Sequence, residues 1–409
     1  MKIIVRHPFG ILVQCAALAF MPAAGSHAQS PAIGVQDVLL SVGINNKELK
    51  MNDQQSLILK SQYAAANALP DPQVSYTRQY GNREGLGING ELVASQSFDF
   101  PSLYAGRSRL ARSKSQSLDL WQASLRRQIL LNAKDICLDL IMLRKERELL
   151  AGRLTNALEL EKLYARRLET GDANRLEANK ISLELLNVET LSRRNALAIE
   201  AGERELEALN GGIPPAFVAD SYEPLPDGGD TASFEDLYAE VSGADPELRA
   251  LRNEQTAAGQ ALSVSRAGWL PSMELGYQLN TAARGERFSG FLVGLKFPVF
   301  SNRRKVQQAR TETVYTRLRY DNAVLRTRSE LLQHYRTTLS LRESMNRYEQ
   351  LFDDQGNLPL LNKALASGNI TMIEYFVEIS TYYDSLQSYI RLENDYQKSV
   401  SRLFQHRLP

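Results

Sequence analysis

Two stretches of the chain alternate apolar and polar residues with the period of a β-strand. In the clearer one, Met273–Leu279, every second residue is apolar and the residues between are polar or glycine. A return stretch, Phe291–Phe297, alternates in the same way after a turn that carries glycine and charged residues. This pattern predicts a strand hairpin over 272–300. A second, less regular hairpin is predicted over 73–100.

The predicted strands are about 10 residues long, which is the length that crosses a bilayer when a strand is tilted. A soluble hairpin with one face on a core is the alternative interpretation. Four strands cannot close a barrel alone, and open strand edges are not tolerated in lipid. If the strands enter a membrane, several chains must therefore share one barrel.

Each hairpin is followed by a long helical pattern. Residues 105–169 contain no proline, and apolar residues recur every seven positions, for example at Ile129, Ile136 and Leu143. A sustained heptad predicts a coiled-coil seam, and a helix of this length spans roughly 97 Å. The second long helix is expected over 302–366, with an interruption at Gly356 and Pro359 shortly before its end.

Both long helices are expected to end in a tight tip at a glycine, Gly171 or Gly368, in the left-handed conformation of a C-terminal cap. Return helices are expected directly afterwards, over 174–210 and 371–406. The helices that precede the two hairpins are expected at Val35–Asn67 and Phe234–Ser265.

The elements occur twice because the chain contains an internal repeat. Landmarks recur at an offset of 199 residues before the hairpin turn and 197 after it, where Phe100 returns as Phe297. Two tandem globular domains are the alternative, but one copy cannot bury the seam of so long a helix. The predicted division is a first repeat over 29–210, a linker rich in glycine and proline over 211–231, and a second repeat over 232–409.

The N-terminus has the pattern of an export signal. Lys2 and Arg6 precede the apolar stretch Ile11–Phe20, and Ser26-His27-Ala28 fits a cleavage site with small residues. We therefore predict a signal peptide over 1–28. A lipid on Cys15 is not expected, because Gln14 stands where a lipoprotein signal has a small residue.

Composition argues against several classes of function. The 409 residues have 48 basic and 47 acidic side chains and a net charge of +1, so no general attraction to nucleic acid is expected. After cleavage the chain retains one cysteine, Cys137, and two histidines, His334 and His406. This set is too small for a metal cluster or a Cys-His catalytic pair. We expect no enzyme, no metal site and no cofactor.

The segments that flank the hairpins and tips resemble the TolC family of outer-membrane efflux ducts, over essentially the whole mature chain. They are Leu69-Pro70-Asp71-Pro72, Ser95–Pro101, Gly294–Phe300 and the turns at Gly171 and Gly368. The resemblance implies a mostly α fold with a small β-barrel contribution. It implies a homotrimer in which each chain lends four transmembrane strands to a shared 12-stranded barrel. A long periplasmic coiled-coil α-barrel would continue that barrel.

The same resemblance implies a passive exit duct in the outer membrane of a Gram-negative bacterium, in contact with outer-membrane lipid and extending into the periplasm. An inner-membrane pump of the resistance-nodulation-division class would supply the energy, and a periplasmic adaptor would dock on the helical tips. The implied docking residues are Leu168, Gly171, Asp172, Leu176, Leu365, Gly368, Asn369 and Ile373.

The resemblance also implies an acidic ring at the periplasmic aperture, formed by Glu374 and Glu378. These residues are four apart and share a helix face. At the matching positions the first repeat has Glu177 and Ile181, so the repeat is broken at the second of them. Solvated residues on the flank of a coiled coil are the alternative interpretation of both glutamates.

Other functions remain open on the sequence. A type I secretion duct has the same architecture, and the adaptor and pump that accompany the chain would separate the two. A periplasmic coiled-coil scaffold or adaptor is less favoured, since adaptors of that kind have one helical hairpin and lipoyl-like modules. A hydrolase is a distant third hypothesis. The sequence does not identify the exported substrate.

Overall fold

The computed structural model describes residues 34–224, 233–282, 285–300, 302–353 and 357–408. The predicted signal peptide, 1–28, and most of the second half of the predicted linker, 225–231, lie outside these residues. The chain from Ile33 onward forms one compact unit.

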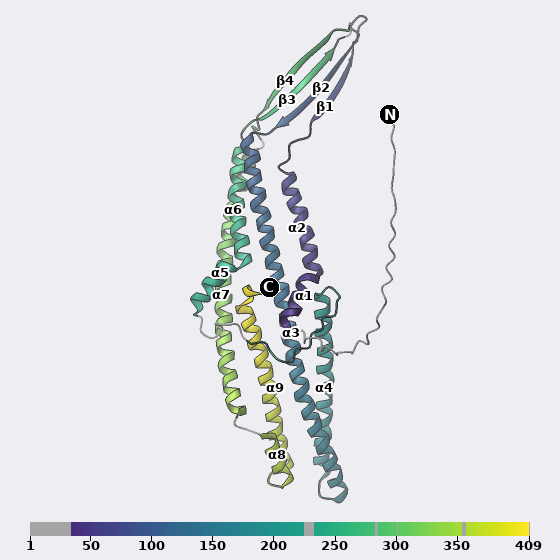
Figure 1. Cartoon of the computed structure of the whole chain (residues 1–409), viewed down its shortest axis with the longest axis vertical. Helices are drawn as coiled ribbons and strands as arrows, with labels where there is room; N and C mark the ends of the chain where they lie inside the picture. The colour runs from purple at the N-terminus through teal and green to yellow at the C-terminus, as the bar shows by residue number, and fades with distance from the viewer. Residues whose placement is uncertain (1–33, 225–232, 283–284, 301, 354–356, 409) are drawn as a thin grey trace, which may run out of the picture. The chain divides into compact units, whose positions relative to one another are not determined.

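Helices make up most of the described chain and are joined by a small antiparallel sheet, as predicted (Figure 1). The first half contains α1 (Val35–Asn45), α2 (Lys47–Ala65), β1 (Gln73–Tyr80), β2 (Ile88–Phe98), α3 (Pro101–Thr170) and α4 (Arg175–Leu209). The second half contains α5 (Phe234–Ala244), α6 (Pro246–Ala267), β3 (Ser272–Thr281), β4 (Arg287–Lys296), α7 (Asn302–Asp353), α8 (Asn357–Ala366), α9 (Met372–Leu403) and the short 3₁₀ helix η1 (Gln405–Arg407).

The helix that was expected before each hairpin is in fact two helices. Asn46 separates α1 from α2, and its side-chain Oδ1 accepts a hydrogen bond of 2.9 Å from the backbone N–H of Leu49. Asp245 separates α5 from α6 in the same way, and Pro246 occupies the first position of α6. Both breaks are helix N-caps. The expectation of single helices over Val35–Asn67 and Phe234–Ser265 is therefore wrong.

The second long helix is also divided. α7 ends at Asp353 and α8 begins at Asn357, so the expected helix over 302–366 is two elements. Pro359 lies in the first turn of α8, where a missing N–H is tolerated. α3 has no such break and runs for 70 residues, roughly 105 Å. Among the described residues no helix has a stretch long and apolar enough to cross a membrane.

The two hairpins lie side by side in one sheet, with the strand order β1-β2-β3-β4. The central contact is between β2 and β3, where Tyr277 lies between Ala94 and Phe291. Alternation places the predicted apolar residues of all four strands on one face, and most of them are exposed. β1 and β4 each have one neighbour among the described strands, so the outer edge of each is open.

The helices around the middle of α3 enclose the largest core. α1 contributes Val38 and Leu39, α3 contributes Leu130 and Leu140, and α4 contributes Leu206. These side chains are at most 1% exposed. Burial of each is worth roughly 1.5–3 kcal/mol relative to exposure. This core joins α1 to the outbound and return helices of the first half.

A ladder of ion pairs joins α3 of the first half to α9 of the second. As the residue number rises along α3 it falls by a similar number along α9, as antiparallel helices require. The pairs are Asp135–Arg402 at 3.3 Å, Asp139–Lys398 at 2.6 Å, Lys145–Glu393 at 2.6 Å and Glu146–Arg391 at 2.8 Å. Single partly exposed pairs contribute little stability. These ion pairs instead specify the register of α3 against α9, because the acidic and basic residues of the two helices face each other in one alignment.

Candidate functional site

The two helical tips are built in the same way. Gly171 has φ +81° and Gly368 has φ +72°, a left-handed conformation that other L residues adopt with strain. In both turns the next N–H returns to the helix: Asp172 N donates to Arg167 O at 2.8 Å, and Asn369 N donates to Ala364 O at 2.9 Å. The glycines therefore reverse the chain within a few residues, as expected.

A capping box begins each return helix. Asn174 and Glu177 bond each other's backbone N–H at the start of α4, with distances of 2.9 and 3.0 Å. Thr371 and Glu374 do the same at the start of α9, where Thr371 N donates to Glu374 Oε2 at 2.7 Å. The backbone hydrogen bond from Thr371 holds the pKa of the exposed Glu374 carboxyl below its usual value. Glu374 is thus ionised, and one of its oxygens is engaged in the cap.

The residues predicted to dock a partner differ in exposure. Leu176 is 74% exposed, Ile373 58% and Leu168 41%, which is high for large apolar side chains. Leu365, the counterpart of Leu168, is 6% exposed and packs into a core cluster with Met372. The turn residues Gly171, Asp172, Gly368 and Asn369 are all exposed. The two tips therefore share a backbone but present different apolar surfaces.

Glu378 is exposed one turn beyond Glu374 on α9. It lines a groove of about 510 Å³ together with Tyr348, Phe352, Leu361 and Tyr382. Its counterpart in the first half, Ile181, is 1% exposed. At the position where the two repeats differ, the first repeat thus has the buried Ile181 and the second has the exposed carboxylate of Glu378.

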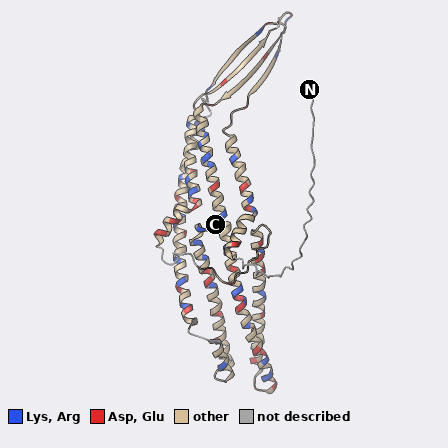
Figure 2. Cartoon of the chain, in the orientation of Figure 1, with Lys and Arg blue, Asp and Glu red and all other residues tan. Residues whose placement is uncertain are grey.

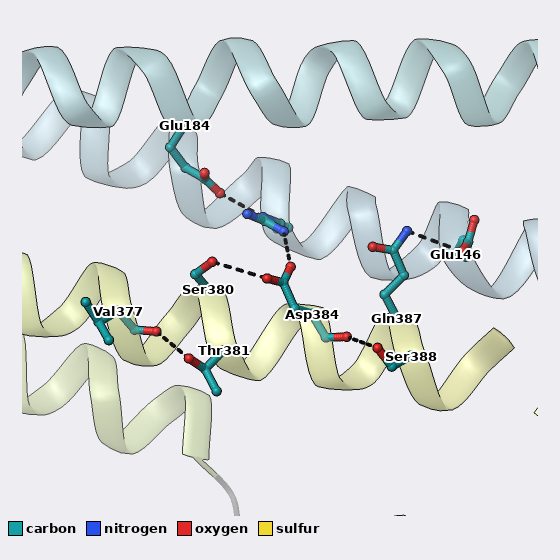
Figure 3. Close-up of polar contacts among 9 residues, drawn as sticks. Glu146, Glu184, Val377, Ser380, Thr381, Asp384, Gln387 and Ser388 are labelled. Carbon is teal, nitrogen blue, oxygen red and sulfur yellow. Dashed lines mark hydrogen bonds and ion pairs between the residues drawn. The ribbon is translucent and has the colours of Figure 1, made fainter. Parts of the chain in front are cut away.

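Arg153 of α3 joins both return helices, a contact that sequence reasoning missed. Its Nε is 2.7 Å from Glu184 Oε1 on α4, and its Nη1 is 3.8 Å from Asp384 Oδ1 on α9. Its guanidinium also lies 5.1 Å from the centre of the Tyr383 ring. Figure 3 places Glu184 and Asp384 on either side of this link, with Ser380 beside Asp384. No local sequence motif predicts such a contact between helices that are far apart in the sequence.

Tyr375 makes a second link that was not predicted. It is fully buried, its hydroxyl donates to Asn362 Oδ1 on α8 at 2.7 Å, and it accepts from Asn156 Nδ2 on α3 at 2.8 Å. Burial raises the pKa of this phenol, so it stays protonated. Helical spacing of aromatic residues was the sole signal available in the sequence, and it does not distinguish a core tyrosine from one that links three helices.

The described residues offer little for chemical catalysis. Cys137 is buried, and desolvation raises the pKa of its thiol to about 12, so the reactive thiolate is scarce at neutral pH. Within the part of the chain that the structure describes, no three His, Cys, Asp or Glu side chains gather closely enough to hold a metal ion. The arrangement at the tips is instead one of packing, caps and ion pairs that hold helices together.

Comparison with solved structures identifies the fold. A membrane protein of Pseudomonas aeruginosa matches with a TM-score of 0.78 at 16% identity, over 91% of this chain and 92% of that one. The outer-membrane protein VceC of Vibrio cholerae matches with a TM-score of 0.73 at 15% identity, over 91% and 94%. The outer-membrane channel MtrE of Neisseria gonorrhoeae, solved in an open state, matches with a TM-score of 0.72 at 15% identity, over 91% and 88%.

The chain has the fold of TolC-type outer-membrane channels. The resemblance seen in the sequence is thus confirmed at the level of the fold, although few residues are identical. Comparison of the sequence itself, with protein-family models and with curated proteins, gives no match.

The Tyr375 link gives a prediction for the stability of the tips. Tyr375→Phe removes the hydroxyl that bonds Asn156 and Asn362, at a cost of about 1 kcal/mol because both partners are partly solvated. We expect faster amide hydrogen exchange in α8 and the first turns of α9. Tyr382→Phe is the matched control, since that half-buried ring packs beside the same cluster. Equal exchange in the two variants would contradict the link.

Proposed function

We propose that this chain is one subunit of a trimeric outer-membrane channel, which forms the passive exit duct of a tripartite efflux pump. One observation carries the proposal. A four-stranded sheet with an apolar exposed face and two open edges continues directly into helices of a TolC-type fold. A fold alone does not determine a function, so the argument rests on what this sheet requires.

The sheet requires lipid on one face and further strands at both edges. Its exposed apolar residues include Tyr277, Phe291 and Val293, at 48%, 89% and 73%. A patch of this size is unfavourable in water but suits a bilayer. In lipid, however, the unpaired backbone groups of β1 and β4 would be costly. Three chains that pair β4 of one copy with β1 of the next would close a 12-stranded barrel and leave no edge.

The helices would then continue the barrel as a tunnel into the periplasm. In this proposal transport through the tunnel is passive, and a partner supplies the energy. We propose that a periplasmic adaptor docks on the exposed apolar residues of the tips, Leu168, Leu176 and Ile373. The adaptor would connect the channel to an inner-membrane pump, of the resistance-nodulation-division class in our proposal.

We further propose that Glu374 and Glu378 of three chains narrow the tunnel as an acidic ring that favours cations. Both are exposed on one face of α9, beside the buried residues Tyr375 and Ile379. The links through Arg153 and Tyr375 would hold α9 against α3 and keep this aperture narrow. Opening would require α9 to move away from those partners.

The proposed function predicts where the protein is found and what it does in a bilayer. Fractionated cells should yield it in the outer membrane as a detergent-stable trimer. The purified trimer should give ion conductance in planar bilayers without an energy source. A soluble monomer, or a membrane trimer without conductance, would rule out the duct.

The acidic ring predicts cation block that depends on two positions. Gln at position 374 keeps the acceptor that the capping box needs, so Glu374→Gln with Glu378→Gln removes charge without removing the cap. We expect divalent cations added on the side of the tips to block the double variant about tenfold less strongly.

Glu177→Gln is the matched control, because Glu177 occupies the same capping position in the first half. In the single variant Glu378→Gln, the Glu374 residues of three chains form the acidic ring, so the pH dependence of block reports on Glu374.

Because the pKa of Glu374 is lowered, its carboxylate stays charged as the pH falls to the ordinary glutamate value. Block should therefore persist to that pH and disappear below it. Block that is unchanged in the double variant would refute the ring.

A further inference from the structure

Basic residues gather where the helices meet the sheet. Residues 101–118 of α3, 255–270 at the end of α6 and 302–311 at the start of α7 contain no aspartate or glutamate. They contain nine cations, which we call the basic collar: Arg107, Arg109, Arg112, Lys114, Arg266, Arg303, Arg304, Lys305 and Arg310. The whole chain has a net charge of +1, so the excess is local (Figure 2).

The collar has two sides. Lys305 lines one groove with Lys114 and an adjoining groove with Ser272 and Lys296. Ser272 and Lys296 are paired on the polar face of the sheet, so this side of the collar continues that face. Arg109 is five residues before Lys114, a rotation of roughly 140° around α3, and it lines a different groove.

The second side of the collar therefore lies away from the groove that Lys305 and Lys114 line. Arg112 follows Arg109 on the same face of α3, and Arg266 is exposed near the end of α6. On α7, Arg303 and Arg310 are rotated away from Lys305. We call this set the outer arginines: Arg109, Arg112, Arg266, Arg303 and Arg310.

The outer arginines are exposed and have no carboxylate partner among the described residues. All five are exposed, and none takes part in an ion pair within the described part of the chain. Arg107, on the other side of the collar, is instead paired with Asp99 at 2.7 Å. Like charges that are three residues apart on a helix repel. A cluster of this kind is favourable when an external anion neutralises it.

An aromatic band separates the outer arginines from the apolar strands. Trp269 is 48% exposed, Phe297 61% and Phe300 95%. Aromatic side chains collect at the boundary between hydrocarbon and headgroups. Along the molecule the order is thus apolar strand face, aromatic band, arginines. A bilayer leaflet has the matching order of hydrocarbon, headgroup boundary and phosphate.

We propose that the outer arginines bind the phosphates of anionic phospholipid headgroups in the leaflet on the helical side of the membrane. The proposal rests on the proposed function, since it requires that the strands lie in a bilayer. Guanidinium groups bond phosphate oxygens through two parallel N–H donors. A basic residue near an anionic surface strengthens binding by about fivefold.

The test compares lipid retention by the purified full-length trimer in bilayers of phosphatidylcholine mixed with phosphatidylglycerol. The variant replaces all five outer arginines with glutamine. The control replaces five exposed arginines far from the sheet with glutamine: Arg166, Arg175, Arg193, Arg204 and Arg347. Native mass spectrometry counts the retained lipids, and conductance in pure phosphatidylcholine is recorded for each protein.

We expect wild type and control to retain phosphatidylglycerol in preference to phosphatidylcholine, and the variant to lose at least about tenfold of that preference. All three should conduct equally. If the wild-type trimer conducts but does not retain phosphatidylglycerol in preference to phosphatidylcholine, the lipid-binding proposal is wrong and the channel stands. The same holds if the variant keeps the wild-type preference. Displacement of the lipid by inorganic phosphate at constant ionic strength would assign the site to a soluble anion. A trimer that does not conduct overturns the channel and the collar together.

Discussion

The open edges of the four-stranded sheet are the constraint on which the other features depend. β1 and β4 each have a hydrogen-bonded neighbour on one side within the described strands, while the exposed face is apolar. A face of this kind favours lipid, and in lipid each unpaired backbone group costs several kcal/mol. Closure with further copies satisfies both demands at once. In the proposed trimer, closure would also place the long helices of every copy around one axis and so form the tunnel.

Contacts within the chain align its two halves and leave apolar side chains exposed for contacts between chains. The halves are joined by the polar ladder between α3 and α9, by the links through Arg153 and Tyr375, and by the apolar cluster of Leu160 and Ile181 with Met372. Large apolar side chains remain exposed along the helices, including Leu57 of α2 and Leu325 of α7. Such residues are the ones that neighbouring copies would cover. The ladder thus sets how the halves align, and apolar contacts would hold the copies together.

The sequence predicts the regular parts of this fold because each has a local signal. Alternation of apolar and polar residues predicts the strands, and the heptad of apolar residues predicts α3. Gly171 and Gly368 predict the two turns. The breaks at Asn46 and Asp245 were missed, although both are common N-cap residues, because the apolar pattern continues across them. At the tips, the exposure of Leu176 and the burial of Leu365 depend on packing against α9. Arg153 and Tyr375 were missed because their partners lie on other helices.

Cross-linking between sheet edges tests the central claim most directly. In a chain with Cys15 and Cys137 replaced by Ala, Thr77→Cys on β1 is combined in turn with Gly290→Cys, Leu292→Cys or Gly294→Cys on β4. All four positions lie on the polar face of the sheet. Oxidation of the membrane-bound protein should give covalent dimers and trimers and nothing larger, whereas each single-cysteine chain should give no trimer. Monomers alone, or a ladder that extends beyond three chains, would contradict closure by three copies.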